Sequence, residues 1–220
     1  TEKYYKIKSC RISGSQRLVK WADLRSQPLA NNLLSLDSKT PNRYPLEVLV
    51  CENCTLSQLS IVVDPKEMFT NYLWRAGLSK SWMDHCEWIA HSIHQSTTDS
   101  GKILDIGCND KTLLRTFKTR GWKVTGVDPS LEHENGYETR KVYWSLDEAK
   151  FLTTGYKQHK FDAITATNVL AHVDDVHDFM KGVKLALAPN GMFFVEVPYV
   201  NDLIKNLRFD TIYHEHLSYF

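Results

Sequence analysis

Residues 104–110 read L-D-I-G-C-N-D, and this run constrains the fold more than any other feature of the chain. It ends a buried-strand pattern that begins at Lys102, places an acidic residue at Asp105, and turns at Gly107. In an open parallel sheet, ligands bind at the carboxyl ends of the strands. A glycine there lets the backbone approach a ligand where any Cβ would clash. The run therefore predicts an α/β fold with a ligand site after its first strand.

The chain from about residue 101 onward alternates strand-like and helix-like segments, which is typical of βα units. Before it, apolar residues from Trp82 to Ile93 recur every three or four positions and predict an amphipathic helix. Apolar residues at helical spacing between 173 and 187 predict another. Strands are expected at 102–106, 122–128, weakly near 141–143, then 161–166 and 191–197. This order predicts a parallel sheet with right-handed crossovers, flanked by helices.

Residues 1–78 follow a different pattern. Short strand-like runs such as 46–50 are separated by Pro, Asn and Ser, and no βα alternation is visible. We therefore predict two domains, a small one over residues 1–78 and the α/β domain over residues 79–220.

The composition excludes several classes of function. Lys and Arg number 27 against 26 Asp and Glu, so the basic excess typical of nucleic-acid binders is missing. No apolar run approaches the ~20 residues that span a bilayer, and the first residues are charged where a signal peptide needs an apolar core. Five cysteines without secretory context favour reduced thiols or metal ligands over disulfides. We predict a cytoplasmic protein without nucleic-acid or membrane partners.

The turn after the first strand indicates which ligand is bound. The dehydrogenase pattern G-x-G-x-x-G, which seats a pyrophosphate, is absent after Gly107. Asp105, Asn109 and Asp110 suit an amine, a cation and hydroxyls, which S-adenosylmethionine (SAM) carries. Asp128 ends the second strand about 20 residues after the glycine, where such folds place the carboxylate that binds ribose hydroxyls. The alternative is that this strand and turn occur by chance. The position of Asp128 and the order of the later motifs argue against it.

Four runs resemble the ordered motifs of class I SAM-dependent methyltransferases: 104–110, G-V-D-P at 126–129, F-D at 161–162 and L-A-P-N-G at 187–191. The resemblance implies a Rossmann-like class I methyltransferase domain. It departs at Lys111, where many relatives have glycine, and this change could narrow the pocket or alter the start of the helix.

Further runs resemble a narrower family, the nucleotide-sugar C-methyltransferases that act on 4-keto deoxysugars. The resemblance covers nearly the whole chain, and Y-H-E-H at 213–216 is its most specific part. It implies a small N-terminal zinc-binding domain, the methyltransferase domain and a C-terminal domain, which is absent here and which a companion chain could supply. It also assigns Asn168 and Tyr72 to the cofactor site. The matching runs are C-R-I-S-G-S at 10–15, Q-P-L-A-N at 27–31, Y-P-L at 44–46, C-E-N-C at 51–54, Q-L at 58–59, N-Y at 71–72, N-V-L-A-H-V-D-D at 168–175 and Y-H-E-H-L-S-Y at 213–219.

The zinc site of that family pairs two C-x-x-C runs. Here Cys51 and Cys54 form one, while the other reads Cys10 and Ser13. Serine is a poor zinc ligand, but three thiolates could hold a structural zinc together with a water or a borrowed side chain. The alternative is a metal-free domain with buried thiols.

The resemblance also implies the catalytic residues. Tyr213 serves as the base with support from His216, His172 stabilises an enolate, and Glu215 binds substrate hydroxyls. Because a free tyrosine has a pKa near ~10, an imidazolium at His216 or His172 is expected to lower it. The alternatives are a packing role for His172 and a solvated loop at 213–216.

We therefore predict SAM-dependent methylation of a nucleotide-linked sugar, at a carbon next to a ketone. One alternative is an O- or N-methyltransferase of a small molecule, which needs the same cofactor residues and no enolate. Another is a non-catalytic SAM-binding subunit, which would explain Ser13, Lys111 and the absent C-terminal domain. A dehydrogenase is the third.

Overall fold

The computed structural model divides the chain into two compact units, each of which is described by itself. Unit 1 comprises Thr1–Tyr72, Leu170–Val176 and Val197–Phe220, and unit 2 comprises Leu73–Val169 and His177–Glu196. The structure describes residues 3–30, 40–64, 67–68, 79–97, 100–131, 136–154 and 160–220.

Unit 2 is built on a parallel sheet whose strand order is β10-β9-β6-β7-β8. All four pairings are parallel, and β6 lies at the centre, with the next strands of the chain added on one side and the later ones on the other. The predicted α/β class is confirmed. The strands are β6 (Lys102–Ile106), β7 (Lys123–Val127), β8 (Glu138–Arg140), β9 (Phe161–Thr167) and β10 (Leu187–Glu196).

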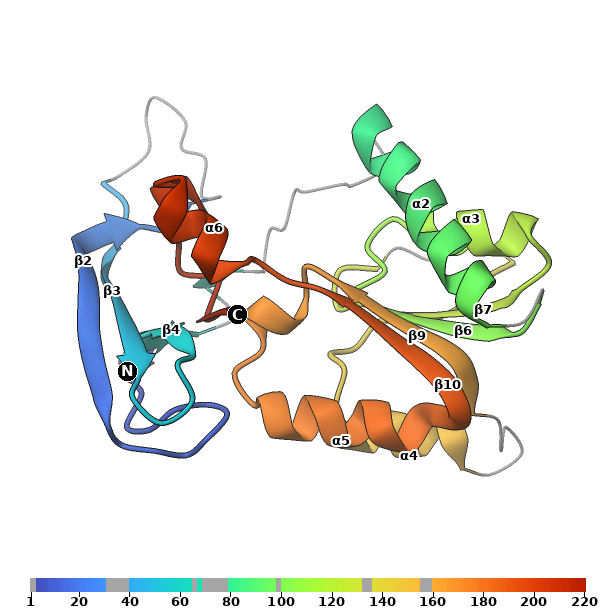
Figure 1. The fold of residues 1–220 in the computed structure, drawn as a ribbon, viewed down its shortest axis with the longest axis horizontal. Helices are drawn as coiled ribbons and strands as arrows, with labels where there is room; N and C mark the ends of the chain where they lie inside the picture. Colours follow the sequence, from blue (N-terminus) through green and yellow to red (C-terminus); the bar gives the residue numbers. More distant parts are fainter. Residues whose placement is uncertain are drawn as a thin grey trace. The chain divides into compact units, whose positions relative to one another are not determined.

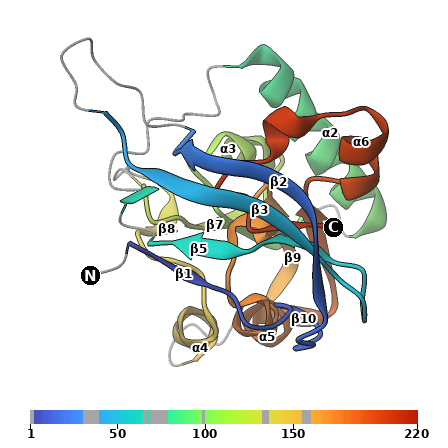
Figure 2. The same cartoon turned by 90° about the vertical axis from the view of Figure 1, so that its left-hand side faces the viewer.

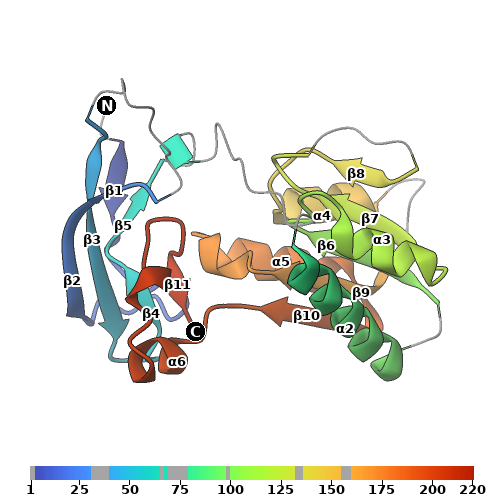
Figure 3. The same cartoon turned by 90° about the horizontal axis from the view of Figure 1, so that it is seen from above.

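Helices cover both faces of this sheet. The helices α2 and α3 lie on one face, and α4 and α5 lie on the other (Figures 1 and 3). They are α2 (Lys80–Ser96), α3 (Thr112–Thr119), α4 (Leu146–Thr153) and α5 (Val176–Ala186). This layering is what right-handed crossovers between parallel strands produce.

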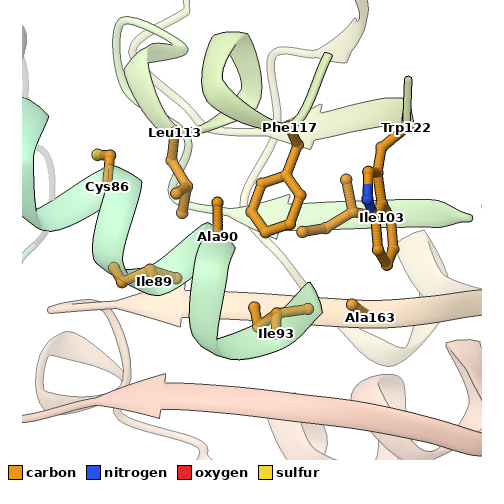
Figure 4. Packing of buried hydrophobic residues seen from close by; sticks show 9 residues of the cluster. All are labelled: Cys86, Ile89, Ala90, Ile93, Ile103, Leu113, Phe117, Trp122 and Ala163. Carbon is orange, nitrogen blue, oxygen red and sulfur yellow. The ribbon is translucent and has the colours of Figure 1, made fainter. Parts of the chain in front are cut away.

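The apolar face of α2 forms the core on its side of the sheet, as the spacing predicts. Ser79 caps the helix, its Oγ accepting a hydrogen bond from the N–H of Trp82 at 3.3 Å. Phe117 and Trp122 meet edge to face, with ring centroids 5.4 Å apart. Figure 4 shows the packed set, which consists of Cys86, Ile89, Ala90, Ile93, Ile103, Leu113, Phe117, Trp122 and Ala163.

Unit 1 holds an antiparallel sheet of order β11-β4-β3-β2 and a separate antiparallel pair of β1 and β5. Figure 2 shows β2 and β3 running side by side as its longest strands. Alternate residues of β3 are buried, and Leu46 and Val48 among them pack with apolar residues from the C-terminal segment, including Leu203 and Leu217. The elements are β1 (Tyr4–Lys6), β2 (Leu18–Pro28), β3 (Arg43–Cys51), β4 (Ser57–Leu59), β5 (Ile61–Val63), α6 (Val200–Lys205), β11 (Ser218–Tyr219) and the 3-10 helices η3 (Leu170–His172) and η4 (Phe209–Thr211).

The structure assigns two C-terminal segments differently from the expected domains, whose boundary lies between residues 78 and 79. Residues 170–176 and 197–220, which the sequence analysis assigned to the second domain, belong to unit 1. The reason is pairing between distant residues: β11 joins β4 through Ser218 opposite Gln58. In the part of the chain that the structure describes, no helix combines the length and the apolar character needed to cross a membrane.

Candidate active site

The turn after β6 requires a glycine for two separate reasons. Gly107 has a φ of +74°, a conformation that strains residues with a Cβ. A Cβ added there would lie 2.3 Å from Cγ2 of Val169. The N–H of Gly107 donates to the carbonyl of Val127 at 2.7 Å, which ties the turn to the end of β7. The backbone at this point is therefore closely confined.

We expect Gly107→Ala to lower the free energy of unfolding of unit 2 by about 1–3 kcal/mol, because it adds backbone strain and a clash. Urea denaturation followed by fluorescence would measure the change. Gly121→Ala is the matched control, since Gly121 also has a positive φ of +84° but a Cβ there meets no atom within 4 Å. If both substitutions lower the free energy of unfolding equally, the side chain of Val169 moves aside without a measurable cost.

Asp128, at the end of β7, organises the loop that follows β6. Its Oδ2 accepts a hydrogen bond from the N–H of Asn109 at 3.0 Å. Its Oδ1 accepts from the N–H and the Oγ of Ser130 at 2.7 and 2.6 Å. The structure thus brings Asp128, Asn109 and the turn at Gly107 together at one edge of the sheet. Ser130 was not singled out in the sequence, although it stands in the G-V-D-P-S run.

Lys111 stands at a backbone position that glycine adopts without strain. It precedes α3 with a φ of +65°, in the left-handed region. Its side chain is nevertheless buried. The helix begins at Thr112, directly after this lysine.

Asp105 is buried within β6 and contacts the neighbouring strand. Its Oδ1 accepts a hydrogen bond from Oγ1 of Thr165 at 2.8 Å. Burial raises the pKa of Asp105 to about 7, the charge of Asp128 adds to the rise, and the Thr165 bond opposes it. A cation bound nearby would favour the ionised carboxylate. The pair of carboxylates at Asp105 and Asp128 therefore suits a cationic ligand.

Asn168 lies in a polar cluster that follows β9 and β10. Its N–H donates to the carbonyl of Glu196 at 2.9 Å, and its Nδ2 donates to Oε1 of Glu196 at 3.1 Å. The other carboxylate oxygen of Glu196 lies 2.6 Å from Nε2 of His85, whose ring stacks on Trp88. The sequence analysis missed Glu196 and His85. The V-E-V-P run at the end of the expected last strand is the signal that could have found Glu196.

The proposed catalytic residues His172, Tyr213 and His216 lie together in unit 1. The hydroxyl of Tyr213 is 2.8 Å from Nε2 of His216, and the two ring centroids are 4.1 Å apart. The ring of His172, at the end of η3, meets the ring of His216 edge to face at 4.9 Å. Two segments that are distant in the sequence thus supply one cluster of a phenol and two imidazoles.

The environment of His216 selects one tautomer. Its Nδ1 lies 2.9 Å from the carbonyl of Thr211, which can only accept, so Nδ1 carries the proton. In the neutral ring Nε2 is then an acceptor, and the hydroxyl of Tyr213 donates to it. Burial lowers the pKa of His216, which keeps the ring neutral at neutral pH.

The neutrality of both imidazoles changes the expected electrostatics. Burial, and to a smaller degree the neighbouring His216, lowers the pKa of His172 to about 3. The imidazolium that the sequence analysis placed at His216 or His172 is therefore disfavoured. Tyr213 has a neutral proton acceptor beside it instead of a positive charge.

The other two residues of the 213–216 run are buried. Glu215 is 6% exposed, and His214 is 2% exposed. Nε2 of His214 lies within 3.3 Å of the carbonyls of Tyr44 and Pro45, so His214 ties this turn to β3. Tyr72, assigned to the cofactor site by resemblance, lies outside the described residues.

A cavity of about 310 Å³ in unit 1 borders this turn. Its volume is at the lower end of the range of small-molecule sites. It is lined by Leu24, Gln27, Pro28, Ala30, Leu46, Asp210, Ile212, Tyr213 and His214.

Cys10, Cys51 and Cys54 converge in unit 1. Their Sγ atoms all lie within 4.8 Å of one another, and those of Cys10 and Cys54 are 3.6 Å apart. Thiolates in a tetrahedral zinc site at ~2.3 Å from the metal are separated by about 3.8 Å. Ser13 lies beside them, with Oγ 3.3 Å from Sγ of Cys51. The three cysteines fit a zinc ion, and Ser13 stands beside them where the matching family run has its fourth cysteine.

The thiol of Cys10 is predisposed to ionise. Burial alone would raise its pKa, but hydrogen bonds from Ser13, Ile12 and Gln58 outweigh burial and lower that pKa to about 6. The hydrogen bond with Ser13 likewise lowers the pKa of Cys51. Because thiolates are the form that binds metal, both shifts favour a metal site.

Comparisons with known proteins agree with this architecture. A family model described as "Methyltransferase domain" matches residues 83–220. A second model, described as "Putative zinc binding domain", matches residues 10–69 and so includes all three clustered cysteines.

Two individual relatives are methyltransferases by name. The chain is 33% identical to C-methyltransferase NovU of Streptomyces niveus, over 97% of this chain and 53% of that protein. It is 27% identical to the ubiquinone biosynthesis O-methyltransferase of Haemophilus ducreyi, over 53% of this chain and 52% of that protein. The chain thus spans about half the length of these curated relatives.

Among solved structures, the chain is similar to SAM-bound CalS10, an amino pentose methyltransferase from Micromonospora echinaspora. The identity is 21% and the TM-score 0.44, over 59% of this chain and 58% of that one. The methyltransferase model covers more than half of the sequence and includes every strand of the parallel sheet. The chain belongs to the methyltransferase domain family.

Proposed function

We propose that this chain is the SAM-binding and proton-transferring part of a methyltransferase that acts on a nucleotide-linked sugar. The methyl group is added to a carbon next to a ketone. A cytoplasmic location and a companion chain or domain that binds the nucleotide remain predictions from the sequence.

The residues at the carboxyl edge of the unit 2 sheet are assigned to the cofactor. Asp128 binds the ribose hydroxyls, and the turn at Gly107 lets the backbone lie against the ligand. Asp105 and Asn109 contribute polar groups that suit an amine and a cation, and Asn168 closes the site at the end of β9. When bound, SAM supplies an electrophilic methyl group on a sulfonium centre.

Tyr213 and His216 are assigned to removal of the α-proton. The phenol oxygen of Tyr213 takes the proton from the carbon next to the ketone while its own proton moves to Nε2 of His216. The resulting imidazolium keeps its Nδ1–H bond to the carbonyl of Thr211, which offsets part of the burial that lowers the pKa of His216. A standing tyrosinate is then unnecessary, so the pKa of free tyrosine near ~10 is no obstacle.

His172 is assigned to the enolate oxygen that this proton removal creates. Because burial keeps its imidazole neutral, it can donate an N–H without competing for the proton that Tyr213 removes. A donor aimed at developing negative charge is usually a large catalytic contribution. Glu215, in the same turn, is assigned to substrate hydroxyls.

One observation carries the proposal of carbon methylation: the hydrogen-bonded series from Tyr213 through His216 to the carbonyl of Thr211. Such a series can pass a proton from the substrate carbon through Tyr213 to His216 and hold it away from the reacting carbon. The cavity beside Tyr213 has room for a small substrate group. The C-methyltransferase name of one relative agrees with this assignment.

The experiment that tests this function supplies a nucleotide-linked 4-keto deoxysugar and SAM to the chain, and to any longer protein that contains it. Mass spectrometry detects the added methyl group, and NMR distinguishes a new carbon–methyl from an O–methyl signal. An O–methyl product would place the chain with O-methyltransferases. Product absent from both proteins would remove the sugar assignment.

We expect Asp128→Ala to weaken SAM binding by about 1.5–3 kcal/mol, because a charged hydrogen bond to the ribose is lost. Isothermal titration calorimetry measures this directly, without a substrate. Asp84→Ala is the control, since Asp84 is an exposed carboxylate of α2 paired with Lys80. Unchanged affinity in Asp128→Ala would contradict the cofactor assignment, and equally tight binding of NADH would favour a dehydrogenase.

A further inference from the structure

Arg11 follows Cys10, one of the three clustered cysteines, and precedes Ser13 in the same loop. Its side chain is only 3% exposed, and a guanidinium is always charged. Burying a charge is costly unless it is paired and hydrogen-bonded. The partners of Arg11 therefore show what this charge is used for.

The guanidinium reaches both segments that carry the clustered histidines. Its Nε donates to Oδ1 of Asp174 at 3.1 Å, two residues after His172. Its Nη1 lies 3.4 Å from the carbonyl of Leu217, the residue that follows His216. Arg11 thus binds next to each of the two imidazoles.

Nη1 also anchors Arg11 to β4. Nη1 donates to Oε1 of Gln58 at 3.2 Å and lies 3.3 Å from the carbonyl of Leu59. The same Oε1 also accepts a hydrogen bond from the backbone N–H of Arg11 at 3.1 Å. The position of the guanidinium is therefore set by β4 as well as by the loop that carries Cys10.

The two histidine segments are also bonded to each other. The N–H of Leu217 donates to the carbonyl of Ala171 at 2.7 Å, and the rings of His172 and His216 lie 4.9 Å apart. The backbone of the metal loop, the guanidinium and the two histidine segments form one connected set of contacts within unit 1. A displacement of the loop would be transmitted to both imidazoles through Arg11.

A purely stabilising role is the simpler reading of Arg11, but the energetics weigh against it. Apolar residues of similar volume often stabilise a protein as much as a buried ion pair does. What the planar fork adds is directional bonding that holds several groups in one geometry. Those groups adjoin His172 and His216, so the geometry that Arg11 holds is that of the candidate catalytic cluster.

We propose that Arg11 is a positioning residue, through which metal binding at Cys10, Cys51 and Cys54 sets the geometry of His172 and His216. This inference rests on the proposed function for its catalytic meaning, while the geometric coupling itself is independent of activity. The metal cluster is then the scaffold of the proton-transfer residues as well as a stabiliser of the unit.

The test follows the histidine side chains by ¹⁵N NMR in the zinc-loaded chain. In the wild type we expect His216 to be the neutral ring with its proton on Nδ1. In Arg11→Met we expect that single signature to be lost at His216 and the signals of His172 to shift, while one zinc per chain and SAM affinity are retained. Arg17→Met is the control, because Arg17 is exposed and belongs to the same segment.

Two further variants keep the test decisive if Arg11→Met fails to fold. Asp174→Asn removes one charge at a side chain that is 44% exposed, and Arg11→Lys keeps the charge but loses the fork. In both variants we expect the signals of His172 and His216 to lie between those of the wild type and those of Arg11→Met. Removing zinc from the wild type should likewise abolish the single signature of His216 and shift the signals of His172. Adding zinc back should restore both in the wild type and neither in Arg11→Met.

Activity supplies a separate readout. If the proposed function holds, Arg11→Met lowers kcat by up to ~10²-fold with little change in KM for SAM, as expected for a misplaced proton-transfer group. Unchanged His172 and His216 spectra in Arg11→Met, or in the zinc-depleted wild type, would overturn the positioning role. Changed spectra in a protein that methylates no sugar would overturn the proposed function and leave the coupling intact.

Discussion

Tyr213→Phe is expected to lower the rate of methylation by ~10²–10⁴-fold, the usual cost of losing a general base. The substitution removes one hydroxyl, so the hydrogen bond to His216 is lost while the packing of the ring is kept. SAM binding should be unchanged, because Asp128, Gly107 and Asn168, which are assigned to the cofactor, belong to unit 2. Steady-state kinetics and calorimetry together measure both effects.

Proton exchange makes the same prediction sharper. With a 4-keto sugar nucleotide in deuterated water, the wild type should introduce deuterium next to the ketone without SAM, and Tyr213→Phe should not. Tyr199→Phe is the matched control, since Tyr199 is 62% exposed in the same unit. Exchange at the wild-type rate in Tyr213→Phe would move the base elsewhere, with His216 as the first candidate. The measurement includes any longer protein that contains the chain, because the chain spans about half of its relatives.

Removal of zinc is expected to unfold unit 1 and to leave unit 2 folded. Structural zinc contributes about 10–16 kcal/mol in small zinc-binding peptides, which equals or exceeds the stability of a typical domain. Elemental analysis should find close to one zinc per chain. After chelation, hydrogen exchange should accelerate in β3 and β4, whereas amides of α2 and β6 should keep their protection.

Substitutions at the cluster separate this effect from general damage. Cys51→Ser should abolish zinc binding, whereas Cys108→Ala is the control, since Cys108 is a buried cysteine of unit 2 outside the cluster. Ser13→Cys should raise zinc affinity, because it completes a set of four thiolates. A wild-type protein that is metal-free and equally stable would mean that Ser13 marks a lost site.

The sequence by itself predicted the architecture of unit 2, and the reason is local. Buried parallel strands appear as short apolar runs, and an amphipathic helix repeats its apolar residues every three or four positions. The expected strand at 102–106 matches β6, and the helix predicted from Trp82 to Ile93 lies within α2. The weak strand near 141–143 was misplaced by a few residues, since β8 has only three residues and is not buried.

The motifs at the strand ends, together with the family resemblance, identified the residues that gather at the candidate sites. Asp128 and Gly107 follow strands, and the cysteines keep the spacing of a metal site. The structure places His172, Tyr213 and His216 in one cluster, although what they catalyse remains a proposal.

Only the tertiary structure decided to which unit those histidines belong and in which protonation state they stand. Segments 170–176 and 197–220 join unit 1 through the pairing of β11 with β4, a contact between distant residues that no local pattern records. The neutral imidazoles follow from burial, and the partners of Arg11 follow from three segments meeting in space. Local periodicity encodes the elements, whereas burial and long-range pairing exist only once the chain has folded.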